Sequence, residues 1–178
     1  MKSSEFMQAM ERVDKQGIWA LPLFNLRTIF PEHAKAFMKG LARMEEAGLI
    51  SKIARGLYVN PKARSLPLDV LASLVPFLRP WDMNYLSLKS LLSEAGWISQ
   101  MPSRLTMMTS GRKGVFETPY GTIEFVHTKR KPDLLMKELH WDSARELYLA
   151  TPERAWKDLK RVGRNIDLVI PEEERHGR

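Results

Sequence analysis

The first 59 residues combine three short stretches of helical periodicity with one alternating stretch, and this order limits the possible fold more than any other feature. The predicted elements are helices over residues 4–15, 22–30 and 33–47 and a β-hairpin over residues 49–59. Pro22 suits a first helical turn, Gly48 ends the third helix, and the hairpin turns near Arg55 and Gly56. Three short helices followed by a hairpin predict a winged helix-turn-helix.

Residues 61–67 interrupt all periodicity with prolines and basic residues and therefore predict a domain linker. The elements predicted beyond it are helices over 68–78, 87–95 and 152–160 and strands over 105–109, 115–118, 122–126 and 145–149. Thr151 is expected to cap the last helix. The chain is thus predicted to be α+β. Its predicted parts are the winged helix-turn-helix over 1–62, a mixed α/β domain with a small, mainly antiparallel sheet over 66–170, and a polar tail over 171–178.

The composition favours a polyanionic partner. Lys and Arg number 28 against 21 Asp and Glu, which gives a net charge of +7. Residues 1–64 hold 11 of the basic and 6 of the acidic side chains. Nucleic acid and an anionic membrane surface both fit this balance. Membrane insertion is disfavoured, because Pro67, Asp69 and Pro76 interrupt the longest apolar stretch.

Cysteine is absent, which excludes disulfides, thiolate zinc sites and cysteine nucleophiles. The N-terminal residues alternate charged and apolar side chains and lack the hydrophobic region of a secretory signal, so a cytoplasmic location is expected.

The third predicted helix carries a row of cations opposite its apolar face. Lys35, Lys39 and Arg43 lie within about 40° of one line, because four residues advance 400° at 3.6 residues per turn. Ala36 and Gly40 flank this row and are expected to allow close approach to a DNA groove. The predicted DNA-binding residues are Arg27, His33, Lys35, Lys39, Arg43, Lys52, Arg55 and Lys62. An acidic protein partner and an ordinary solvated face fit the same row.

A second basic stretch lies in the predicted C-terminal domain. Further phosphate contacts are expected from Arg104, Arg112, Lys113, Lys129 and Arg130, and Lys131 follows them. A solvated surface and an acidic partner are the alternatives. The five tryptophans are expected in the core or at the domain junction rather than in base stacking.

Enzyme chemistry finds little support. No Asp/Glu-x-Lys run follows on a predicted strand after Asp133, as a metal-dependent nuclease would require. The four histidines have no metal-ligand spacing, and the serines sit in no nucleophile elbow. The run from Gly111 to Gly114 lacks the strand-to-helix setting of a phosphate loop and predicts a tight basic turn. We therefore expect no catalysis, no cofactor and no bound metal.

Four short runs resemble the AbiEi family of abortive-infection, type IV antitoxins, in the family's order. They are G-L-I-S-K-I-A-R-G-L-Y-V at 48–59, Y-L-S at 85–87 with S-L-L-S-E-A-G at 90–96, G-R at 111–112 with Y-G-T-I-E-F-V-H at 120–127, and A-T-P-E-R-A at 150–155 with Asp158. Together they span most of residues 6–162. The second run is similar to the family's tyrosine-led helix, the third to its strand pair and the fourth to a helix start.

The resemblance implies that the first domain represses its own operon by binding promoter repeats, as a monomer or as a weak dimer that binds cooperatively. It also implies that the second domain neutralises a nucleotidyltransferase-type toxin. Many members of the family continue with a longer C-terminal region, so a stand-alone regulator and a basic protein-interaction module remain alternatives.

Overall fold

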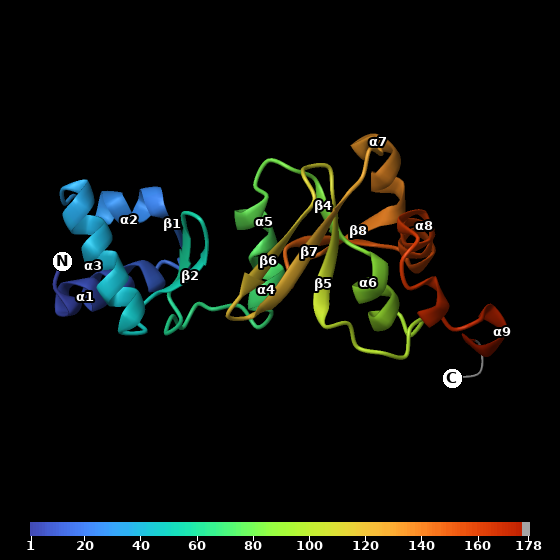
Figure 1. The fold of residues 1–178 in the computed structure, drawn as a ribbon, viewed down its shortest axis with the longest axis horizontal. Coiled ribbons are helices and arrows are strands. Elements are labelled where there is room, and N and C mark those ends of the chain that lie inside the picture. The colour runs from blue at the N-terminus through green and yellow to red at the C-terminus, as the bar shows by residue number, and fades with distance from the viewer. Residues whose placement is uncertain (176–178) are drawn as a thin grey trace. The chain divides into compact units, whose positions relative to one another are not determined.

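A computed structural model describes residues 1–175 of the chain and divides it into two compact units, one over Met1–Val70 and one from Leu71 onward. Both contain helices and strands, so the fold class is α+β, as predicted. Their elements appear in Figure 1. The division falls a few residues beyond the predicted linker.

The N-terminal unit combines helices with very short strands. Its elements are α1 (Ser3–Asp14), β1 (Ala20–Pro22), α2 (Leu23–Ile29), α3 (Ala34–Glu46), β2 (Ser51–Ala54) and β3 (Leu57–Val59). The strands form an antiparallel sheet in the order β1-β3-β2, in which Val59 pairs with Ala20 on one side and with Ser51 on the other. The three predicted helices and the hairpin are therefore present.

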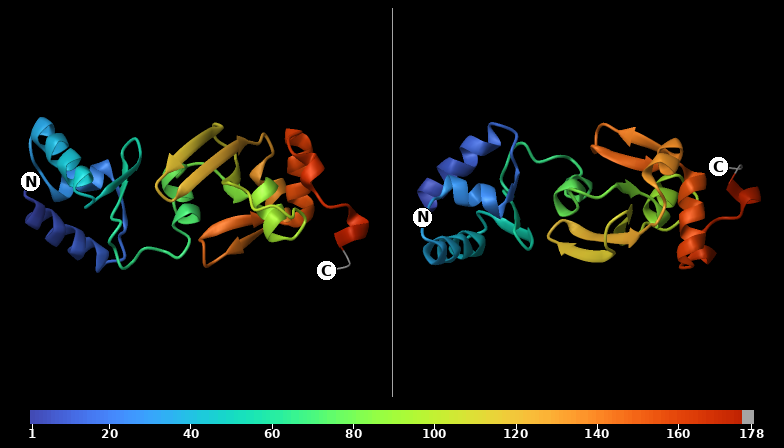
Figure 2. Two further views of the ribbon diagram at one scale, coloured as in Figure 1. Left: turned by 60° about the horizontal axis from the view of Figure 1, so that its bottom comes forward. Right: turned by 90° about the horizontal axis from the view of Figure 1, so that it is seen from above.

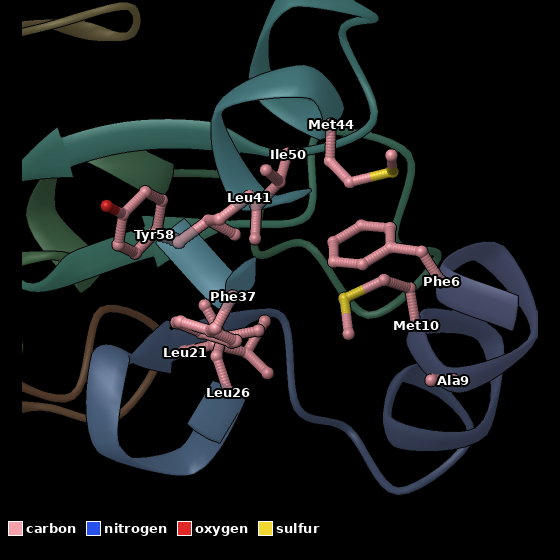
Figure 3. Packing of buried hydrophobic residues seen from close by; sticks show 10 residues of the cluster. All are labelled: Phe6, Ala9, Met10, Leu21, Leu26, Phe37, Leu41, Met44, Ile50 and Tyr58. Carbon is pink, nitrogen blue, oxygen red and sulfur yellow. The ribbon is translucent and has the colours of Figure 1, made fainter. Parts of the chain in front are cut away.

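All three helices contribute to one apolar core. Figure 3 shows its residues: Phe6, Ala9, Met10, Leu21, Leu26, Phe37, Leu41, Met44, Ile50 and Tyr58. Phe37 and Leu41 come from the apolar side of α3, where residues three and four apart share a face. Phe6 of α1 also stacks on Phe30, with ring centroids 5.4 Å apart. Burial of this side of α3 determines which of its residues face solvent.

The first strand was not predicted. Pro22 ends β1 and is the N-cap residue of α2 rather than part of its first turn. Three residues give no readable alternation, and Ala20–Pro22 is a strand because it pairs with β3.

The second unit contains a six-stranded sheet with helices beside it. Its elements are α4 (Val70–Ser73), α5 (Val75–Leu78), β4 (Asn84–Leu86), α6 (Leu88–Glu94), β5 (Arg104–Thr109), β6 (Gly114–Thr118), β7 (Gly121–His127), α7 (Pro132–Leu135), η1 (Met136–Glu138), β8 (Leu139–Asp142), β9 (Leu147–Ala150), α8 (Pro152–Val162), η2 (Ile166–Leu168) and α9 (Glu172–Arg175). The strand order is β6-β7-β5-β4-β9-β8. Figure 2 shows β6–β7 and β8–β9 at opposite edges of this sheet.

The sheet is more mixed than predicted. Three pairings are antiparallel, whereas β5 runs parallel to β7 and β4 runs parallel to β9. The run from Gly111 to Gly114 is consequently not a hairpin turn, because it carries the chain from β5 past β7 to the outer strand β6. The turn at Pro119–Gly121 does join neighbours, β6 and β7.

Several other predictions for the second unit need correction. The helix predicted over 68–78 is two short helices that break at Leu74. Strands β4 and β8 were not predicted, and Tyr85 belongs to β4 rather than to a helix. Thr151 caps α8 as expected, since its hydroxyl oxygen accepts a hydrogen bond from the Arg154 amide. The predicted polar tail begins with α9, and residues 176–178 lie outside the described residues.

Part of the predicted linker is tied to the N-terminal unit. The carboxylate of Asp14, at the end of α1, accepts hydrogen bonds from the amide of Arg64 at 2.8 Å and the amide of Ser65 at 2.9 Å. The Ser65 hydroxyl donates to the same carboxylate at 2.6 Å. These bonds, led by the Ser65 hydroxyl, lower the pKa of Asp14.

We expect Asp14→Ala to destabilise the N-terminal unit by about 1 kcal/mol at neutral pH, a modest value because the carboxylate is partly solvated. Because the folded-state pKa is lowered, this stabilisation is present above the unfolded pKa of about 3.9 and is lost as the pH falls through the folded value. Thermal unfolding of both proteins between about pH 2 and pH 7 measures it. A difference in Tm that persists unchanged at the lowest pH would contradict this role of Asp14.

Candidate nucleic-acid interface

The cationic side of α3 faces solvent. Lys35, Lys39 and Arg43 are all exposed, whereas Phe37 and Leu41 on the opposite side are buried. His33 is the N-cap residue and is also exposed. Within residues 1–175, neither Lys35, Lys39 nor Arg43 forms an ion pair with a carboxylate. The predicted row is therefore available to an external anion.

The chain's first residue covers one flank of this row. Gly40 is buried, and a β-carbon there would lie 3.1 Å from the Met1 β-carbon, so glycine leaves room for Met1. The Met1 ammonium pairs with Glu32, and the Arg43 guanidinium donates to the Met1 carbonyl at 3.1 Å. Gly40 is thus not free to approach a groove as the sequence predicted. The open part of the row is its first half, around Lys35 and Lys39.

The hairpin contributes two exposed cations, Lys52 on β2 and Arg55 at its tip. The tip lies against the start of α2, because the Leu23 amide donates to the Gly56 carbonyl at 2.7 Å. Arg27, one turn further along α2, is exposed, and its guanidinium lies 6.0 Å from the Phe37 ring centroid. The structure therefore connects the hairpin tip to the helix that precedes α3.

Lys62 lies in a different environment. It is exposed and lines a pocket with residues of α1, among them Glu11 and Asp14. Lys15 and Arg64 line the same pocket, and the Lys62 amide bonds to the Asn60 side chain rather than to the row on α3.

The predicted basic stretch of the second unit separates into two places. Arg104 begins β5, whereas Arg112 and Lys113 follow its end, about 17 Å away for a six-residue strand. Glu124 pairs with Arg164 at 2.8 Å and lies 3.9 Å from Arg104. Lys129 and Arg130 follow β7, which runs parallel to β5, so they lie at the same sheet end as Arg112 and Lys113.

Sequence reasoning missed a residue at that sheet end. Trp81, expected in a core or junction, is 95% exposed, and Trp141 is 53% exposed. Trp81 belongs to no periodic segment, so no pattern in the sequence indicated which way it faces.

Two of the AbiEi-like runs meet in a buried polar network. Arg154, 1% exposed, donates to Asp158 at 2.7 Å and to Glu138 at 3.1 Å. The Tyr85 and Ser87 hydroxyls both donate to the second Asp158 oxygen, at 3.0 and 2.9 Å. Ser87 and Ser90 are buried, which corrects their predicted surface or capping positions, although Ser87 is the N-cap residue of α6. These residues hold α8 against the sheet.

Burial and charge shift the titration of this network. Burial, together with the neighbouring Asp158 charge, raises the pKa of Tyr85, so Tyr85 stays protonated and donates. The Lys157 ammonium, 2.9 Å away, and then Arg154 lower the pKa of Glu138. Burial disfavours the Arg154 charge, but the two carboxylates outweigh it and raise its pKa. Tyr85 therefore stays neutral, and Glu138 and Arg154 stay charged, at neutral pH.

The described part of the chain contains neither a cluster of metal ligands nor a helix that could span a membrane. Over residues 1–175, no three His, Asp or Glu side chains gather closely enough to hold a metal ion. His127 is exposed and its Nδ1 lies 2.7 Å from the Gly111 carbonyl oxygen, and His140 is exposed. His176 lies outside the described residues. No helix over the same range is both long and apolar enough to cross a bilayer.

Neither a family model nor a curated protein matches this chain. The resemblance to the AbiEi family consequently stays a prediction.

Proposed function

We propose that the N-terminal unit is a winged helix-turn-helix that binds double-stranded DNA, with α3 in the major groove and the β2–β3 hairpin as the wing. The order of its elements supports this, because helix, strand, two helices and a hairpin surround a single core. A DNA reader of this kind needs one helix with a buried apolar face and an exposed, positive face.

The observation that carries the proposal is the exposure of Lys35 and Lys39 on the half of α3 that is free of acidic residues. Glu45 and Glu46 are exposed at the other end, where they would repel phosphates. The N-terminal half of the helix therefore enters the groove. The partial positive charge of the helix N-terminus adds to the attraction.

The remaining cations fit supporting contacts to the DNA backbone. Lys52 and Arg55 of the wing lie beside the groove, and Arg27 of α2 reaches a flanking phosphate. Arg43 contributes less than its place in the row suggests, because it is already bonded to the Met1 carbonyl.

We infer from the AbiEi resemblance that the protein is a cytoplasmic transcriptional repressor that binds promoter repeats as a monomer or weak dimer. The second unit would then neutralise a nucleotidyltransferase-type toxin. Co-expression of this chain with a nucleotidyltransferase encoded beside it tests the antitoxin role, and growth arrest that the chain fails to relieve would leave a stand-alone regulator.

Duplex binding is tested with a labelled duplex from upstream of the gene and an unrelated duplex of equal length. We expect Lys35→Ala/Lys39→Ala to weaken binding about 100-fold, at about 1.4 kcal/mol for each lost contact. The slope of log K against log salt concentration should also become shallower by about 1.8, which corresponds to the loss of two phosphate contacts. Fluorescence anisotropy at several salt concentrations measures both.

The matched control is Arg12→Ala/Lys15→Ala, which removes the same charge from an exposed position of α1 and from its exposed C-cap residue, Lys15. It should bind almost as the unaltered chain does. Equal weakening by the two pairs would reduce the interaction to general charge attraction, and unaltered binding by the α3 pair would exclude α3 as the reading helix. An acidic protein that binds the row, without any duplex binding, would favour the protein-interaction module.

A further inference from the structure

Three connections meet at one end of the second unit's sheet. Because β5 and β7 are parallel and β4 is antiparallel to β5, residues 79–83 before β4, 110–113 after β5 and 128–131 after β7 share that end. Thr109 pairs with both Asn84 and His127 there. Figure 1 shows all three connections at the upper end of the sheet.

Hydrogen bonds join these connections into a fixed platform. Met83 and Ser110 bond twice, from the Met83 amide to the Ser110 hydroxyl and from the Ser110 amide to the Met83 carbonyl, both at 2.9 Å. The Thr128 amide donates to the Thr109 carbonyl at 2.8 Å. Gly111 lies so close to the Asp82 carboxylate that a β-carbon would overlap it. The backbone of the three connections is therefore held in place before any ligand binds.

Arg79 supports the platform through contacts within the protein, so its guanidinium is not available to a ligand. Its guanidinium lies 4.9 Å from the Phe116 ring centroid and 5.2 Å from that of Phe125. It also donates to the Arg112 carbonyl at 3.4 Å. The Arg112 turn is thus supported by a cation that is already engaged.

The platform displays one aromatic ring among free cations. Trp81 is the only large apolar side chain exposed in the three connections. The exposed cations around it are Arg112, Lys113, Lys129, Arg130 and Lys131, and within residues 1–175 none of them has a carboxylate partner. The opposing charges are Asp82, packed on Gly111, the exposed Asp133, and the exposed Glu146 of the β8–β9 turn at the same sheet end. Ser110–Lys113 and His127 line a shallow pocket beside them.

We propose that this platform binds single-stranded nucleic acid, with Trp81 stacked on an unpaired base and the surrounding Arg and Lys side chains on the phosphates. Sequence-tolerant binding of single strands uses an exposed aromatic ring beside a positive track, and here the ring stands on a hydrogen-bonded backbone. Bases within a duplex are already stacked on each other and offer no face to Trp81. A membrane-inserting loop would need several exposed apolar side chains, and these connections have one. The site is independent of duplex binding by the N-terminal unit.

The test uses the full chain and labelled oligo-dT and oligo-U of about 12 nucleotides, with binding followed by fluorescence anisotropy. We expect Trp81→Ala to weaken binding about tenfold and Trp81→Phe, which keeps a stacking ring, to weaken it less than about threefold. Trp141→Ala is the control for loss of an exposed indole, since Trp141 lies on the edge strand β8 and outside the three connections, and it should bind normally. Stronger binding of oligo-U would assign RNA, and equal or stronger binding of oligo-dT would assign a site that does not require the 2′-hydroxyl.

Failure of this site can be told apart from failure of the N-terminal one. Trp81→Ala should retain duplex binding, and Lys35→Ala/Lys39→Ala should retain single-strand binding. Equal binding of oligonucleotides by Trp81→Ala and the unaltered chain would overturn the proposal. So would absence of oligonucleotide binding, including the case in which the chain binds phosphatidylserine vesicles through Trp81 instead. Because Trp81 is almost fully exposed, its replacement leaves the fold intact.

Discussion

Asp158→Ala is expected to lower the unfolding free energy of the second unit by about 3–5 kcal/mol, the usual cost of removing one partner from a buried ion pair. The substitution leaves the buried Arg154 guanidinium with only Glu138 as a charged partner. It also removes the acceptor of the Tyr85 and Ser87 hydroxyls. Urea unfolding followed by circular dichroism measures the loss.

The control for this prediction is Glu153→Ala, because Glu153 is exposed on the same helix. It should cost less than about 1 kcal/mol. Replacing the pair together, as Arg154→Met/Asp158→Leu, should recover part of the loss, because no uncompensated charge is then buried. A single Asp158→Ala variant as stable as the unaltered chain would mean that the network contributes nothing to the fold.

This network explains why the serines were misjudged from the sequence. Ser87 and Ser90 stand near a helix start, where serine usually caps, and local pattern favours that role. Their hydroxyls are buried because Asp158 and Thr106 lie opposite them, 71 and 16 residues away along the chain. Local pattern carries no information on such pairings.

Helix periodicity and capping residues predicted the helices, because these elements depend mainly on local sequence. Helix α3 ends at Glu46, two residues before the expected Gly48, and α8 begins at the expected Thr151 and Pro152. The strands that were missed, such as β1 and β4, are three residues long and exist through their partners. The parallel pairing of β5 with β7 depends on the whole sheet, so the sequence could not reveal it.

The candidate DNA-binding site on α3 was likewise predictable where it depends on local pattern, and not where it depends on distant residues. Exposure of Lys35 and Lys39 follows from an amphipathic pattern, because burial of Phe37 and Leu41 turns them outward. The cover over Gly40 was not predictable, since Met1 reaches it across 39 positions of sequence.

Long-range structure also determines the second basic site. Arg104 and Arg112 are eight residues apart in sequence but at opposite ends of one strand. The end that holds Arg112 gathers Trp81 and Lys129 from distant segments. Counting charges along the chain therefore groups Arg104 with Arg112, although the sheet separates them. It also overlooks Trp81, which the sheet places at the same end as Arg112.

Phe37→Ala is expected to destabilise the N-terminal unit by about 3–5 kcal/mol, because the ring is 1% exposed in the shared core. Phe37 comes from α3, while Leu21 and Leu26 of the same cluster come from β1 and α2 (Figure 3). A unit of this size has about 5 kcal/mol of stability in total. Most copies of the variant should therefore be unfolded in this unit at 37 °C, and duplex binding should disappear with the fold.

Comparison with the neighbouring residue makes this prediction specific. Met38→Ala changes a partly exposed side chain next to Phe37 and should cost less than about 1 kcal/mol. Phe37→Leu, which keeps an apolar group, should fall between the two. Cooling to about 15 °C, near the usual temperature of maximum stability, or an osmolyte should restore duplex binding to Phe37→Ala, because Lys35 and Lys39 are intact, but not to Lys35→Ala/Lys39→Ala. Duplex binding that survives when α3 is unfolded would separate DNA recognition from this helix altogether.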